Sequence, residues 1–244
     1  MTGGATAATA LRVLTQLRRD PRTVILLIGV PCLLEVLLRE VFSGRPYVFQ
    51  HVGAPLLGLF PFVSMFVVTS VTMLRERTSG TLERLMSMPL AKLDLLGGYA
   101  IAFALVAVVQ ATTVSLLAFG LLGLEVEGHR AAVIALAVGN ATLGMALGLF
   151  VSAFARSEFQ AVQFMPAVVL PQMLLCGLFV ARAEMARWLQ LLSDALPLTY
   201  AYDALAAVAA GEISARFLLD IGVTLGATLI ALAAGAATLR RRTE

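Results

Sequence analysis

Apolar runs of about twenty residues recur along this chain and limit the folds that it can adopt. A hydrocarbon layer about 30 Å thick is crossed by a helix of about 20 mainly apolar residues. We place membrane-spanning helices at residues 22–42, 53–74, 95–123, 131–154, 161–181 and 215–239. Only 14% of the 244 residues are charged, against about 25% in an ordinary soluble domain. The sequence therefore predicts an all-α integral membrane protein with six transmembrane helices in a single domain, residues 1–244.

The basic residues predict which side of the membrane each loop faces, because cytoplasmic segments retain Lys and Arg. With the N-terminus inside, the cytoplasmic segments contain Arg12, Arg18, Arg19, Arg22, Arg75, Arg77, Arg84, Lys92, Arg156, Arg240, Arg241 and Arg242. The outer segments contain fewer bases, and acids dilute them: Glu40, Glu125, Glu127, Glu184 and Glu212. Both ends are therefore predicted to be cytoplasmic. An Arg-rich, Ala-rich chain with a single lysine is typical of a GC-rich bacterial genome, so we expect a bacterial plasma membrane.

Residues 182–214 are apolar enough to suggest a further span, but three features oppose it. Pro197 splits the stretch, and Asp194 and Asp203 would each cost on the order of 3 kcal/mol at the bilayer centre. A seventh span would also export the bases at 240–242. We therefore expect two short half-helices that re-enter the outer leaflet, which is tolerated where protein or a water-filled cavity covers them.

Residues 1–21 form a basic segment before the first span. Leu11, Leu14 and Leu17 fall near one helical face, with Arg12 and Gln16 on other sides. This pattern suits an interfacial helix on the inner membrane surface. It suits equally a basic flank that orients the first span, and the two readings are compatible.

The cytoplasmic segment 75–92 joins the second and third predicted spans. Gly80 ends the preceding helix, Glu83 falls in the first turn of a short new one, where the helix dipole favours an anion, and Pro89 ends it. A short helix held between two spans can be moved by a soluble partner. The same residues also fit an ordinary solvated connector.

Two motifs resemble those of type-2 ABC exporter permeases of the drug-resistance, daunorubicin-exporter-like kind. The first resembles their coupling region, with matching positions Glu76, Arg77, Gly80, Thr81, Leu82, Glu83, Leu85 and Pro89. The second is similar to their outer segment and runs from Leu178-Phe179 through Trp188-Leu189 to residues 196–200 and 203–205. The chain departs from the family pattern at Ala186, where an acidic or polar residue is usual, and it lacks the proline often found near Arg187.

The resemblance implies a permease subunit that exports an amphipathic substrate, such as a drug, an antibiotic or a lipid, from the cytoplasm or the inner leaflet. It implies partners as well: two copies of a cytoplasmic ABC ATPase that dock on residues 75–92, and a second permease, identical or homologous. Glu83 and Arg84 are the expected contacts. The only lysine, Lys92, lies outside any P-loop pattern, so ATP and Mg²⁺ are expected on the partner, with no cofactor and no ATP hydrolysis in this chain.

Polar groups within the spans leave an alternative open, since ion-coupled carriers place such groups near mid-membrane. Glu35 is either a proton or substrate site or the ion-pair partner of Arg39, one turn on. Four amides either line a translocation path or form interhelical hydrogen bonds: Gln110, Asn140, Gln163 and Gln172.

Other function classes find little support. The bases do not cluster with exposed aromatics, which argues against nucleic-acid binding. His51 and His129 lack clustered metal-binding partners, and Cys32 and Cys176 lie inside apolar runs. A membrane-embedded enzyme is therefore the third choice, after a carrier.

Overall fold

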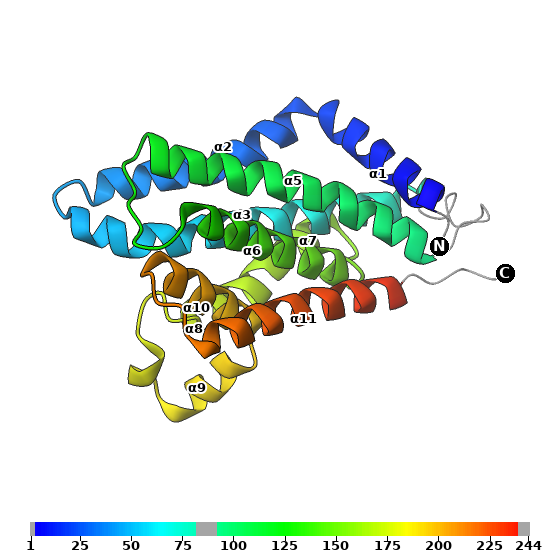
Figure 1. The fold of residues 1–244 in the computed structure, drawn as a ribbon. Coiled ribbons are helices and arrows are strands. Elements are labelled where there is room, and N and C mark those ends of the chain that lie inside the picture. Colours follow the sequence, from blue (N-terminus) through cyan, green and yellow to red (C-terminus); the bar gives the residue numbers. More distant parts are fainter. Residues whose placement is uncertain (1–2, 82–91, 239–244) are drawn as a thin grey trace.

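Five long helices run side by side in a computed structural model that describes residues 3–81 and 92–238 (Figure 1). The elements before the gap are α1 (Gly3–Arg18), α2 (Pro21–Val41) and α3 (Pro46–Thr78). After the gap follow α5 (Lys92–Gly120), α6 (Arg130–Val151), α7 (Glu158–Phe164), the π-helix η1 (Met165–Val169), α8 (Leu170–Leu175), the 3-10 turn η2 (Arg182–Glu184), α9 (Arg187–Asp194), α10 (Pro197–Ala209) and α11 (Ala215–Ala237). No strand occurs within the described ranges, so the predicted all-α class is confirmed there.

Four of these helices are long and apolar enough to cross a membrane, within the described part of the chain: Pro46–Thr78, Asp94–Gly120, Arg130–Val151 and Ala215–Ala237. The first predicted span coincides with α2 but is not among the four, and this helix carries Arg22, Glu35, Arg39 and Glu40. The six-span count therefore stays a prediction.

The segment predicted as the fifth span, residues 161–181, is helical as far as Leu175, is not among these four helices, and its crossing of a membrane stays a prediction. Pro166 and Pro171 lie in this segment, which is divided into α7, η1 and α8 and leaves helical geometry after Leu175. A proline removes one backbone N–H and its ring clashes with the preceding turn, so two of them break the regular hydrogen-bond ladder. The wider π-turn accommodates that break.

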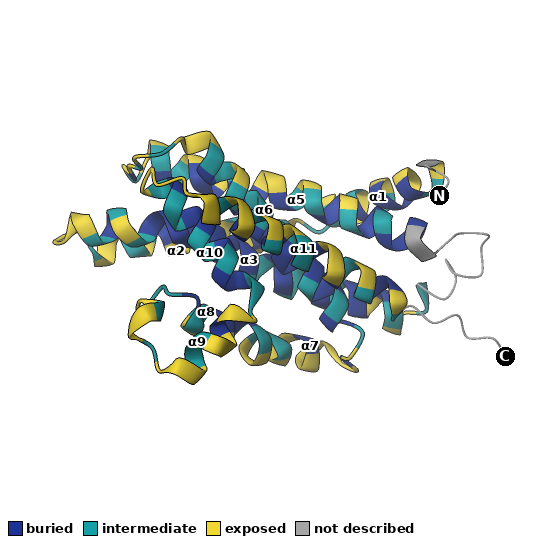
Figure 2. Cartoon of the chain, turned by 60° about the horizontal axis from the view of Figure 1, so that its bottom comes forward, coloured by how far each residue is buried: buried dark blue, intermediate teal, exposed yellow. Residues whose placement is uncertain are grey.

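The bundle is built around the contact of α3 with α6, where Figure 2 shows a concentration of buried residues. A Cβ added at Gly144 would lie 2.2 Å from the Phe62 carbonyl oxygen, and one at Gly148 would lie 2.4 Å from that of Phe66. The two glycines therefore let the helix backbones approach closely, and a four-residue spacing of small residues is typical of such contacts. Gly222 and Gly226 have the same spacing on α11, but a Cβ added at either position would meet no atom of another element within 4 Å.

The start of α1 and the end of α11 lie at the same end of the bundle (Figure 1), as an even number of crossings requires. The loops at 42–45 and 121–129 lie at the other end. Asp20 begins α2 as its N-cap, with Thr23 donating to it through both its hydroxyl, at 2.6 Å, and its backbone N–H. The side-chain hydrogen bond, more than the backbone one, holds the pKa of Asp20 below its usual value.

Alternating charges hold the segment of residues 182–214 to α11. Arg182 contacts Asp194 at 3.3 Å and Asp203 at 3.4 Å, and Arg216 contacts Asp203 at 3.6 Å and Asp220 at 3.9 Å. The segment contains two short helices separated before Pro197, as expected, and its two aspartates are paired. Whether these helices re-enter a membrane stays a prediction.

Candidate functional site

Arg12 of α1 joins two helices that flank the predicted coupling segment. Its Nη2 atom lies 3.4 Å from Oε2 of Glu76, near the end of α3, and also donates a hydrogen bond to the hydroxyl of Tyr99 on α5. The guanidinium carbon lies 5.6 Å from the centre of the Tyr99 ring. Glu76 is only 7% exposed. The contact is therefore a partly buried, charge-assisted junction rather than a surface ion pair.

The other flank of the segment is also tied to α1. The Thr6 hydroxyl donates to Oδ1 of Asp94 at 3.4 Å, and Asp94 is buried. Gly98 allows this approach, because a Cβ there would lie 2.5 Å from the Cβ of Thr9. One helix thus holds the chain just before and just after residues 77–93.

Two further contacts join the end of α3 to the rest of this bundle end. Arg75 donates to both oxygens of Glu158 at the start of α7, at 2.7 Å and 2.9 Å. These hydrogen bonds are the main reason why the pKa of Glu158 lies below its usual value. Arg77 donates to the hydroxyl of Thr238 after α11, at 3.4 Å. Side-chain contacts therefore link the end of α3 to α1, α5 and α7 and to the residue that follows α11.

The residues predicted for coupling divide into two groups. Glu76 and Arg77 make the contacts above, Gly80 has a left-handed backbone with φ of 72° that ends the turn after α3, and the hydroxyl of Thr81 hydrogen-bonds that of Ser79. The remaining positions lie outside the described residues: Leu82, Glu83, Arg84 and Pro89. The coupling helix itself therefore stays a prediction.

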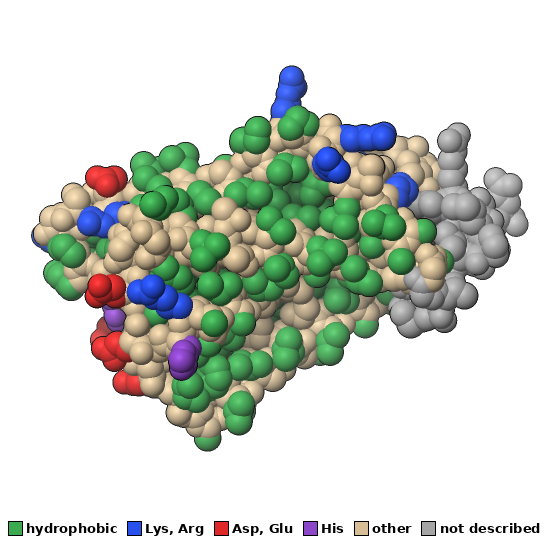
Figure 3. Space-filling model, turned by 45° about the horizontal axis from the view of Figure 1, so that its top comes forward, with side chains coloured by type: hydrophobic (Ala, Val, Ile, Leu, Met, Phe, Trp, Pro, Cys, Tyr) green, Lys and Arg blue, Asp and Glu red, His purple; other side chains and the backbone are tan. Residues whose placement is uncertain are grey.

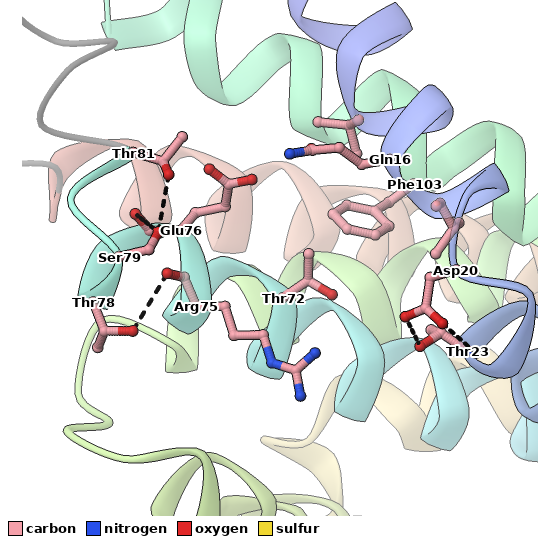
Figure 4. A pocket seen from close by; sticks show the side chains of 12 residues that line it. Gln16, Asp20, Thr23, Thr72, Arg75, Glu76, Thr78, Ser79, Thr81 and Phe103 are labelled. Atoms are coloured by element: carbon pink, nitrogen blue, oxygen red, sulfur yellow. Dashed lines mark hydrogen bonds between the residues drawn. The ribbon is translucent and has the colours of Figure 1, made fainter.

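A pocket of about 540 Å³, lined mostly by polar residues, opens between α1, α3 and α5 beside this junction. Figure 4 shows Asp20 and Thr23 on one side, facing Glu76, Ser79 and Thr81 on the other. The pocket lies where the α1–α2 turn meets the end of α3. It therefore opens next to the predicted cytoplasmic segment.

An apolar groove of about 550 Å³ continues from this pocket between α2, α3 and the η1–α8 segment. Thr23, Thr72 and Arg75 line both hollows, so the two are contiguous. The groove walls are mostly Leu, Val and Met side chains, among them Leu26 and Met173. Together the two hollows form one continuous depression. Polar residues line most of its first part, and apolar residues line most of its second part.

Gln110 is buried and compensates for a proline on another helix. Pro31 has no N–H to donate to the Leu27 carbonyl, one turn earlier in α2, so that acceptor loses its helical partner. The side-chain amide of Gln110 donates to this carbonyl at 2.7 Å and also bonds the hydroxyl of Ser64. Gln110 therefore fastens α5 to α2 and α3.

Asn140 and Gln172 also join helices, while Gln163 does not. Asn140 donates to the Ala201 carbonyl at 3.4 Å and joins α6 to α10. Gln172 accepts from the Leu198 N–H at 3.4 Å, near the start of α10. Gln163 is exposed on α7. A path-lining role for these amides stays a prediction, with Gln163 the one whose side chain remains accessible.

Of the alternatives for Glu35, the ion pair with Arg39 is not formed. Both carboxylate oxygens of Glu35 are buried without a hydrogen-bond partner. Arg39 turns away, donating to the Leu122 carbonyl at 3.2 Å and lying over the ring of Phe49.

Sequence reasoning missed three contributors to the junction: Thr6, Asp94 and Tyr99. The available signal was the placement of acids at both ends of the loop, next to long apolar runs, with bases and hydroxyls on the preceding amphipathic segment. Within residues 3–81 and 92–238, no group of three or more His, Cys, Asp or Glu could hold a metal ion.

The sequence model of the protein family described as ABC-2 type transporter matches residues 5–209. These residues run from α1 to the end of α10. This chain belongs to the ABC-2 type transporter family. The junction of α1 with α3 and α5 lies wholly inside the matched region.

Two relatives illustrate the range of the ABC-2 type transporter family. ABC transporter G family member 20 from Dictyostelium discoideum is 29% identical over 147 residues, covering 60% of this chain and 20% of the relative. The probable multidrug ABC transporter permease YbhR from Escherichia coli is 27% identical over 171 residues, covering 69% of this chain and 46% of the relative. The chain thus spans less than half the length of either protein.

Proposed function

We propose that this chain is a transmembrane permease subunit of an ATP-binding cassette exporter, and that α1 holds together the two helices that carry its ATPase-coupling segment. The observation that supports this most is the pair of contacts from α1, one from Arg12 to Glu76 at the start of that segment and one from Thr6 to Asp94 just after its end. A push on residues 77–93 would move α3, α5 and α1 as one body, because the flanking contacts are partly or fully buried.

Two cytoplasmic ATPase subunits would supply the push. The sequence contains no P-loop pattern, so ATP and Mg²⁺ would be bound by the partners. ATP binding would close the ATPases on each other, displace residues 75–92 and reorient the helices outward. A second permease, identical or homologous, would complete the enclosure.

The substrate is an amphipathic molecule, such as a drug, an antibiotic or a lipid. Support comes from the contiguous hollows, in which Arg75, Thr23 and Thr72 connect a polar pocket to an apolar groove. The charged head group of an amphipathic substrate would bind in the polar pocket, and its apolar body would bind in the apolar groove. The printed description of the Escherichia coli relative as a probable multidrug permease agrees with such a substrate.

In the proposed bacterial plasma membrane, the α1 end of the bundle would face the cytoplasm. Bases at that end include Arg18, Arg19 and Arg22, all exposed. Figure 3 shows acidic side chains gathered at the opposite end and hydrophobic side chains along the middle. This distribution agrees with the tendency of cytoplasmic segments to retain bases.

Expression with an ABC ATPase encoded beside this chain tests the proposal. We expect the two to co-purify, and we expect Glu83→Ala or deletion of residues 79–86 to abolish substrate-dependent ATP turnover. The control is Glu212→Ala, at an exposed site on the other end of the bundle. Unaltered co-purification and turnover in the deletion variant would refute the assignment.

An ion-coupled carrier is the second candidate, and the unpaired carboxyl of Glu35 is the observation that favours it. Such a carrier would transport without any ATPase and would stop when an uncoupler collapses the proton gradient. Transport that needs the ATPase and persists with the uncoupler supports the exporter instead.

A further inference from the structure

Glu35 occupies a position that an ordinary structural carboxylate does not. Its side chain is 0% exposed, inside α2, and neither oxygen has a hydrogen-bond partner. Leu27 and Pro31 precede it on the same buried stripe of the helix. An ionised carboxylate in such surroundings would lack both water and a counter-ion, which is costly enough to favour the neutral acid.

The register of the surrounding helices identifies what faces Glu35. Gln110 of α5 meets Leu27, and Arg39 meets Leu122 in the turn after α5, each with a separation of 83 positions, so α2 and α5 run in the same direction. The same separation brings Glu35 level with Ala118 on α5. Ala118 is fully buried and apolar.

On the antiparallel helix α3, contacts above and below this level bracket the site. Gln110, which bonds Leu27, also bonds Ser64, and Arg39 lies over Phe49, so Glu35 falls near Ala54 and Pro55. Ala54 and Pro55 are both buried and apolar, so neither offers a charge or a side-chain hydrogen bond to the carboxyl group.

Few ionisable groups lie on the elements packed against this site. On α5, residues 95–120 include only Tyr99, which is engaged by Arg12 at the other end of the bundle. On α3, residues 46–74 include only Tyr47 and His51, both exposed. On α2 itself, Cys32 lies one turn before Glu35, while Arg39 is turned to Leu122 and Glu40 is exposed. No cation is therefore paired with Glu35 among the described residues.

We propose that Glu35 is a proton-binding site of this transporter. An O–H bond forms on the carboxyl group with a proton taken from water, and the proton stays bound while α2 packs on α3 and α5. When α2 separates from these helices, the bond breaks, the proton returns to water and the carboxylate is hydrated. The position of α2 and the protonation of Glu35 are thereby coupled.

Infrared spectroscopy of the purified chain in lipid tests this site without any ATPase or substrate. We expect a band of the protonated carboxyl C=O bond at neutral pH that shifts in heavy water and disappears in Glu35→Gln. The matched control is Glu40→Gln, which removes an exposed carboxyl from the same helix and should leave the band in place. A neutral-pH spectrum that Glu35→Gln does not change would overturn the proposal.

Glu35→Asp provides a second variant, because it keeps an acid at the site and should shift the band rather than remove it. A band that titrates away between about pH 4 and 5, like a carboxyl in water, would also overturn the proposal. These results do not depend on the exporter assignment. Failure of ATPase coupling with the Glu35 band present would refute the proposed function alone.

Discussion

Arg12 and Glu76 lie 64 positions apart in the chain, yet their side chains meet at 3.4 Å between α1 and the end of α3. Under the proposed function, this contact would let a helix that precedes the first predicted span take part in coupling. Tyr99 of α5 joins the same junction. The first helix thus connects both helices that lead into the predicted coupling segment.

Glu76→Gln should loosen this junction. The change leaves the partly buried guanidinium of Arg12 without its counter-charge, and an unmatched group of this kind typically costs about 1–3 kcal/mol. Thermal unfolding in detergent should show a lower midpoint, and hydrogen exchange should be faster in α1. Arg18→Ala, at an exposed position on α1, should leave both unchanged, and equal sensitivity of the two variants would contradict the junction.

Gly144→Ala should push α3 and α6 apart. The new Cβ would lie 2.2 Å from the Phe62 carbonyl oxygen, and overpacking of this kind costs about 1–3 kcal/mol. Gly139→Ala on the same helix meets nothing within 4 Å and should be tolerated. The thermal unfolding midpoints of the two variants test this contact. A higher midpoint for Gly144→Ala than for Gly139→Ala would contradict the close packing of α3 on α6.

Gln110→Leu should destabilise the bundle because it removes the donor to the Leu27 carbonyl. We expect a loss of about 1–3 kcal/mol for the unsatisfied buried acceptor. Pro31→Ala restores the helical N–H, so the same Gln110 change should cost less in that background. A double-mutant cycle measures the difference, and strictly additive effects would show that Gln110 does not compensate for Pro31.

Acid should release α7 from α3. The Arg75 hydrogen bonds hold the pKa of Glu158 below its value in the unfolded chain, so this contact stabilises the fold above the unfolded pKa of about 4.3 and is lost as the pH falls through the folded value. Both side chains are more than half exposed, so the effect should be local. Amide exchange in α7 should accelerate on acidification in the wild type, and Glu158→Gln should show faster exchange already at neutral pH.

The apolar pattern predicted most helix positions, since long runs without charges leave few alternatives. It failed where local chemistry within a run decides the outcome. Pro166 and Pro171 lie in a segment as apolar as its neighbours, yet the helix there takes a π-helical form over Met165–Val169 and ends at Leu175. The seven residues before position 53 were also missed, because polar Gln50 and His51 look like a loop although α3 begins at Pro46.

The candidate site was predictable only in part. Glu76 and Arg77 were found through motif resemblance, but the partner of Glu76 is set by how α1 crosses α3, and no local pattern records that crossing. For Glu35, the sequence suggested a contact that the structure does not contain. The spacing of Glu35 and Arg39 favours a helical ion pair, yet Arg39 finds a carbonyl and an aromatic ring nearby. Tertiary contacts therefore outweighed a pairing based on sequence distance alone.

The coupling ratio, measured as substrate exported per ATP hydrolysed, tests the central claim most directly. Vesicles would contain the chain and its ABC ATPase, with wild type, Glu76→Gln and Arg18→Ala compared side by side. We predict that Glu76→Gln lowers the ratio several-fold while ATP hydrolysis continues, and that Arg18→Ala matches the wild type. An unchanged ratio in Glu76→Gln, or export that needs no ATP, would contradict the account.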